Sequence, residues 1–97
     1  MMYEISDELY LEVAERLQPL FLQGDYCSGS IDFEWNSVVC RLLLSAFVYT
    51  ESCLYPEGEQ RFIADVVPVW WEFHTSDESG PVLNDFSFNT LRKYLKQ

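Results

Sequence analysis

Residues 38–49 are apolar on both faces of the strand that they are expected to form. Because alternate side chains of a strand point to opposite faces, one face carries only apolar residues, namely Val38, Cys40, Leu42, Leu44, Ala46 and Val48. The other face carries Val39, Leu43, Phe47 and Tyr49, with Arg41 and Ser45 as its polar members. An antiparallel sheet with one solvated face should alternate apolar and polar residues. Both faces of this strand are therefore expected to be covered.

Two further strands are expected beside this one. Residues 28–35 alternate between apolar and polar side chains, which is typical of a half-buried edge strand. A Pro-Glu-Gly-Glu turn leads from the strand 38–54 into a third strand, 60–74, which contains Pro68. Proline is tolerated at sheet edges and bulges but not in central strands. The pattern predicts a meander with 60–74 at one edge, followed by a loop over 75–85.

A helix is expected at each end of the chain. Residues 6–22 are amphipathic, Ser6 is a suitable N-cap, and Pro19 should cause a kink or a break near Gln18. Residues 88–96 have an apolar stripe at helical spacing. We expect one α+β domain over 1–97, with two layers and both helices packed on one face of a three-stranded antiparallel meander. The second sheet face is then left over.

The charge distribution disfavours direct binding to nucleic acid or to an anionic membrane. The formal net charge is −10, and all sixteen acidic residues lie at or before Asp85. Nucleic acids and anionic membranes bind basic surfaces. No apolar run reaches the length of a membrane span, and no signal peptide is visible. Together with three cysteines, an odd number, these features predict a cytoplasmic protein with reduced thiols.

The residues that usually carry catalysis are sparse. His74 is the only histidine, and symmetric pairing of the second and third strands would bring Cys40 near it. A thiolate beside an imidazole is a nucleophile arrangement, but a cysteine in an apolar strand is more often an inert core residue. The cysteines at 27, 40 and 53 lack zinc-ligand spacing, and no glycine-rich phosphate loop is present. We expect no enzyme activity, no cofactor and no metal site.

The adjacent tryptophans Trp70 and Trp71 indicate where contact with another molecule should occur. Neighbours on a strand point to opposite faces, so one of the two should join the core and the other should lie on the leftover face. Large aromatic side chains on such a face are typical of interface hot spots. We expect a non-enzymatic interaction module that forms a homodimer or binds another protein through Leu43, Phe47, Tyr49 and one of Trp70 or Trp71.

Three alternatives remain open from the sequence. The loop 75–85 could fold back and cover the exposed tryptophan. The same aromatic face could stack a flat small molecule, with Glu72, Arg41 and His74 as polar groups. The carboxylates of Glu8, Glu12 and Glu15 on the first helix could imitate nucleic-acid phosphates toward a basic protein, although a solvated helix face is the more ordinary interpretation.

Overall fold

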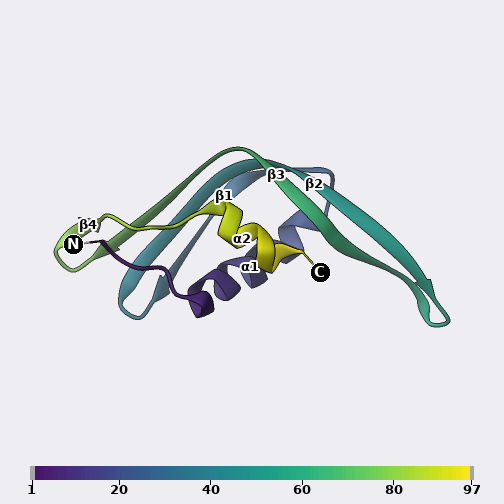
Figure 1. The fold of residues 1–97 in the computed structure, drawn as a ribbon, viewed down its shortest axis with the longest axis horizontal. Coiled ribbons are helices and arrows are strands. Elements are labelled where there is room, and N and C mark those ends of the chain that lie inside the picture. The colour runs from purple at the N-terminus through teal and green to yellow at the C-terminus, as the bar shows by residue number, and fades with distance from the viewer. Residues whose placement is uncertain (1, 97) are drawn as a thin grey trace.

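A computed structural model, which describes residues 2–96, shows an arched antiparallel sheet with two helices beneath it (Figure 1). The elements in chain order are α1 (Asp7–Phe21), β1 (Tyr26–Trp35), β2 (Val38–Tyr55), β3 (Gly58–Asp77), β4 (Gly80–Val82) and α2 (Phe88–Leu95). The strand order across the sheet is β1-β2-β3-β4. The α+β class is confirmed, but the sheet has four strands where three were expected.

The fourth strand arises within the segment 75–85, which was expected to be a loop. β3 continues to Asp77, and its last three residues pair with β4 in antiparallel register. The Thr75 hydroxyl donates to the Val82 carbonyl at 2.7 Å. Gly80 has φ of +113°, a conformation that suits glycine and lets the chain reverse. The turn residues were read correctly, but the short strand after them was missed.

The two long strand pairs of the meander, β1/β2 and β2/β3, differ in geometry. Asn36 and Ser37 both have positive φ, 48° and 68°, as a two-residue type I′ hairpin turn requires. The β1/β2 register that follows is uninterrupted. The β2/β3 register instead shifts twice, between Ser45 and Ala46 and between Tyr49 and Thr50. β-bulges bend and twist a strand pair, so these two shifts account for the arch of the sheet.

Beyond the second register shift, β2 and β3 continue as a two-stranded arm that leaves the body of the molecule (Figure 1). The arm ends in the turn between Tyr55 and Gly58 and contributes to a longest extent of 52 Å. Leu54 near its tip is 87% exposed. No helix lies beneath the end of the arm in the described residues.

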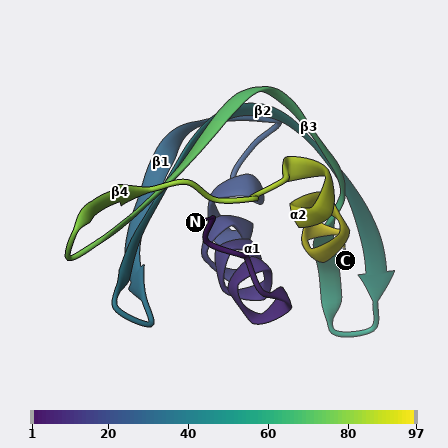
Figure 2. The ribbon, with the colours of Figure 1, turned by 60° about the vertical axis from the view of Figure 1, so that its left-hand side comes forward.

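The core lies between the concave face of the sheet and the helices. Both helices sit inside the arch (Figure 2), and α2 packs against α1 and β3. The face of β2 that begins with Cys40 is buried throughout the body of the sheet, ending at Val48. The large, fully buried helical residues of the same core cluster are Leu9, Val13, Leu17 and Phe21 of α1 and Phe88, Leu91 and Leu95 of α2.

The first helix begins as expected but ends differently. The Ser6 hydroxyl accepts a hydrogen bond from the Leu9 backbone N–H at 3.2 Å, which confirms the N-cap. The helix continues through Pro19 to Phe21, so it does not break near Gln18. A proline in the last turn removes one intrahelical hydrogen bond, and the buried Phe21 ring keeps this turn in contact with the core.

Two sets of contacts hold the C-terminal segment against β3. Phe86 stacks on Phe73 with ring centroids 4.2 Å apart, and the Asn84 amide donates to the Phe73 carbonyl at 3.1 Å. The Arg92 guanidinium on α2 donates to both carboxylate oxygens of Asp65 at 2.9 Å. This hydrogen bonding lowers the pKa of Asp65 below its ordinary value. The ion pair therefore favours the folded state while Asp65 is ionised.

We expect Asp65→Asn to lower the free energy of unfolding at pH 7 by about 1 kcal/mol, because a partly exposed ion pair with Arg92 is lost. A carboxylate whose pKa is depressed in the folded state stabilises above its unfolded pKa, and this contribution is lost as pH falls through the folded pKa. The difference between wild type and variant should therefore shrink below about pH 4. Urea unfolding across pH measures it.

Asp77→Asn is the matched control, since Asp77 accepts from the Ser79 backbone N–H and has no cationic partner in residues 2–96. An equal pH dependence in both variants would contradict the assigned role of the Asp65–Arg92 pair.

Candidate functional site

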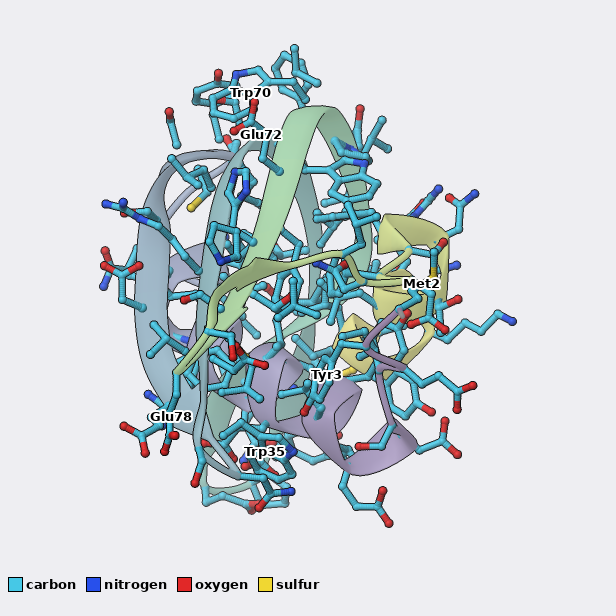
Figure 3. The ribbon with its side chains drawn as sticks, turned by 90° about the vertical axis from the view of Figure 1, so that its left-hand side faces the viewer. Met2, Tyr3, Trp35, Trp70, Glu72 and Glu78 are labelled. Atoms are coloured by element: carbon cyan, nitrogen blue, oxygen red, sulfur yellow. The ribbon has the colours of Figure 1, made fainter. Side chains whose placement is uncertain are left out.

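The convex face of the sheet, here called the open face, lies opposite both helices. Figure 3 shows Trp70 and Glu72 on this outer side, away from α1 and α2. The second apolar row of β2, for which the sequence predicted no cover, lies on this face. Its members Phe47 and Tyr49 are 48% and 56% exposed. The segment 75–85 does not roof this face, because Trp70 is still 47% exposed.

Apolar side chains gather on one half of the open face. Phe47 on β2 lies in register between Tyr26 on β1 and Val67 on β3. The Tyr26 and Phe47 rings meet edge to face, with centroids 5.2 Å apart. Trp70 lies opposite Ser45, on the neighbouring row of the same face. We call this set the aromatic patch; its members are Tyr26, Phe47, Tyr49, Val67 and Trp70.

The predicted interaction residues separate into two groups. Phe47, Tyr49 and Trp70 belong to the aromatic patch, and Leu43 lies partly buried on the same face, opposite Glu72. Trp71 is on the helix side, where its ring packs against Phe86 and Phe88 at centroid distances of 5.4 and 6.2 Å. The two tryptophans therefore point to opposite faces as expected, but Trp71 stays 37% exposed and does not join the core.

Two patch members were missed by sequence reasoning. Tyr26 precedes the expected start of the first strand at residue 28, so it was not assigned to a face. Val67 was inside an expected strand, but its pairing with Phe47 depends on the register shift beside Ser45. Extending the apolar/polar alternation of residues 28–35 back to Tyr26 would have placed Tyr26 on the open face. No local sequence pattern indicates that Val67 lies on the open face.

The other half of the open face is polar. The register places Arg41 between Asp32 on β1 and His74 on β3. Arg41 pairs with Asp32 at 3.1 Å, and His74 pairs with Glu72 at 3.1 Å. All four side chains are more than half exposed, so each pair contributes little to stability. Arg41 neutralises the Asp32 carboxylate on this face, and the contact of His74 with Glu72 is a hydrogen bond.

An open cavity of about 880 Å³ borders the polar half. It extends from Arg41 and His74 to the segment that follows β3. Its apolar lining comes from Val39, Trp71, Phe73, Pro81, Val82, Leu83 and Phe86. The volume lies within the range of small-molecule sites. Arg41 is exposed and already paired with Asp32, and the exposed His74 imidazole already contacts Glu72, so few polar groups are free to orient a ligand.

Cys40 and His74 do not form a nucleophilic pair. Cys40 lies opposite Thr75, whereas His74 lies opposite Arg41, so their side chains are on different faces. Cys40 is fully buried, and burial raises the pKa of its thiol to about 11. A thiol with such a pKa stays protonated and unreactive near neutral pH. The described residues also contain no group of three His, Cys, Asp or Glu side chains that could hold a metal ion.

The acidic row on α1 is interrupted. Glu8 and Glu15 are exposed, but Glu12 forms an ion pair with Arg16 at 2.9 Å. Arg16 also lies over the Phe33 ring, 4.5 Å from its centroid. Leu11, which is 45% exposed, separates the acids further. The row is therefore less like a continuous line of phosphates than the sequence alone implies.

Comparison of the chain with protein-family models, with curated proteins and with solved structures found no match. No helix within residues 2–96 has the length and apolar character needed to cross a membrane. Function is therefore inferred from the surfaces and contacts of the structure.

We expect the three free thiols to react with Ellman's reagent at different rates at pH 8. Cys53 is partly exposed and should react first, Cys27 more slowly because burial raises its pKa, and Cys40 only after unfolding. Stopped-flow absorbance with and without denaturant measures this order. Rapid native-state labelling of Cys40, identified by mass spectrometry, would show that its thiol is accessible after all.

Proposed function

We propose that this protein is a non-enzymatic interaction module that self-associates through the aromatic patch. The observation that carries the proposal is the patch itself, in which four neighbouring aromatic side chains are each about half exposed on a sheet face with no cover from residues 2–96. Contiguous apolar patches of this kind on small proteins mark contact sites. Tyrosine and tryptophan are also enriched among the residues that dominate interface energies.

Burial of the patch would contribute favourable free energy to association. Full burial of a large apolar side chain contributes about 2 kcal/mol relative to exposure. Phe47 and Trp70 each have roughly half of their surface still in water. The Phe47 ring lies between its cross-strand neighbours Tyr26 and Val67, so its ordering on contact costs little conformational entropy.

A second copy of the chain is the occupant that the charges favour. Of the carboxylates near the patch, Asp32 is paired with Arg41 on the open face, and Asp65 is paired with Arg92. The exposed acids of α1 lie beneath the arch, on the opposite side of the sheet. These ion pairs reduce the repulsion between two open faces, and the exposed Asp25 beside the patch and Glu34 on β1 are left as the carboxylates that salt must screen. A two-fold symmetric dimer is the commonest closed arrangement.

A second candidate function is the binding of a small molecule in the cavity beside Arg41 and His74. The size of the cavity and its aromatic lining favour it. The scarcity of free polar groups places it behind self-association. Mimicry of nucleic acid by α1 is weaker still, because Glu12 is paired with Arg16. In all cases the free cysteines suit a reducing compartment such as the cytoplasm.

We expect wild-type protein to be a dimer and Trp70→Ser and Phe47→Ser to raise the dimer dissociation constant at least about tenfold each, because both rings would be buried at the contact. Light scattering on a sizing column over a concentration series measures the mass. Leu11→Gln is the matched control, since Leu11 is 45% exposed but lies on α1.

The control variant should keep the wild-type mass. A wild-type monomer across the whole concentration range, or a dimer unaffected by both patch substitutions, would rule out a second copy as the occupant of the patch.

A further inference from the structure

The outer edge of β1 has free backbone hydrogen-bonding groups along its length. The Val48 N–H donates to the Asp25 carbonyl at 2.8 Å, and the β1/β2 register runs on from this pair without interruption. In an antiparallel pair the bonded and non-bonded residues alternate. Odd-numbered residues of β1 therefore bond to β2, whereas the N–H and C=O groups of Ser28, Ser30 and Asp32 point away from it.

The opposite edge of the sheet is interrupted by a proline and is covered by a further strand at its end. β3 carries Pro68 beside a register shift, and its end pairs with β4. The Asn84 side chain also donates to the Phe73 carbonyl at the same edge. Prolines, bulges and covering segments are the usual means by which proteins block unwanted strand pairing. β1 has no proline, no lysine and no bulge.

The helix side of β1 is incompletely buried at this edge. Cys27, Ile31 and Trp35 pack against the core but remain partly exposed. Between the first two, Gly29 leaves a gap, because a Cβ atom placed there would have no other atom within 4 Å. A strand laid along β1 would place apolar side chains over this row and into the gap.

The open-face side of the same edge is polar and acidic. Its side chains are Ser28, Ser30, Asp32 and Glu34, all exposed. Asp32 is paired with Arg41, whereas Glu34 has no ion pair among residues 2–96. Cross-strand neighbours of opposite charge stabilise a sheet and like charges directly opposite destabilise it. A neighbouring strand should therefore present hydroxyl or basic side chains on this side.

We propose that the outer edge of β1 binds an extended segment of another protein, which adds as a further strand. The segment has apolar residues at alternate positions, facing the helix side of the sheet, and hydroxyl or basic residues between them. Backbone hydrogen bonds provide affinity in this mode of recognition, and alternate side chains provide specificity. The centre of this site at Ser30 lies outside the aromatic patch, and only Tyr26, the first residue of β1, belongs to both surfaces.

The test uses the full-length protein and a synthetic peptide, Thr-Val-Lys-Val-Arg-Val-Thr, whose alternation fits both sides of the edge. Amide hydrogen exchange followed by NMR is the readout. Saturating peptide should slow exchange at Ser28, Ser30 and Asp32 by about tenfold or more, since these amides gain partners. The amides of Gly29 and Ile31 are the internal control, because their bonds to β2 exist already and their exchange should change little.

Two comparisons separate strand addition from attraction between a basic peptide and an acidic protein. A peptide of the same composition with its valines adjacent should bind at least about tenfold more weakly. Ser30→Pro removes one outward N–H at an edge position where proline is tolerated, so it should weaken binding similarly, whereas Ser30→Ala should not. Thermal unfolding verifies that the proline variant is folded.

Equal binding of both peptides, or no slowing at the three outward amides, would overturn the proposal. Protection of the same amides in concentrated protein without peptide would also overturn the assigned occupant, since a second copy would then occupy the edge. Loss of the dimer in Trp70→Ser with unchanged peptide binding would show that the two surfaces act separately.

Discussion

The structure depends on a single layer of helices packed against a sheet whose central strand is apolar on both faces. β2 buries the row from Cys40 to Val48 against α1 and α2, and this contact contains most of the core. Both described helices lie on the same side. The second apolar row of β2, with Phe47 and Tyr49, is therefore left in water. The aromatic patch exists because β2 has two apolar faces and the helices cover only one of them.

The bulges decide which residues complete the patch. Trp70 and Val67 are three positions apart, so strict alternation would put them on opposite faces. The register shift beside Ser45 resets the alternation, and both side chains then lie on the open face. The same reset buries Val66 at 1% exposure and leaves Val67 at 39%. The shift beside Thr50 likewise allows Ile63 and Val66 to share the core side.

The sequence could not predict these two register shifts or the faces of the residues beyond them. The existence and order of both helices and the three long strands followed from apolar periodicity, and Pro68 was correctly expected at an edge or bulge. The opposite directions of Trp70 and Trp71 followed from their adjacency alone. A bulge, however, depends on the curvature that the whole sheet needs in order to enclose two helices. No local pattern around Ser45 specifies it.

The same physics explains why symmetric pairing about the turn would bring Cys40 near His74, whereas the structure pairs Cys40 with Thr75. A register read from a turn is uncertain by about one residue, and a one-residue shift moves a side chain to the other face. The β4 strand was missed for a different reason. Its three residues are too few to show a period, and their pairing depends on the Thr75 hydroxyl and on the Gly80 backbone.

The open face and the β1 edge are governed by different interactions, and they meet at Tyr26. The patch offers apolar area with little directional preference, whereas the edge offers backbone groups at fixed spacing. Tyr26 is the first residue of β1 and also a member of the patch, in contact with Phe47. A strand added along β1 would therefore extend the open face by one strand beside the Tyr26 ring. Occupancy of the edge would change the area and shape that the patch presents, so the two surfaces can influence each other through this residue without any change in the core.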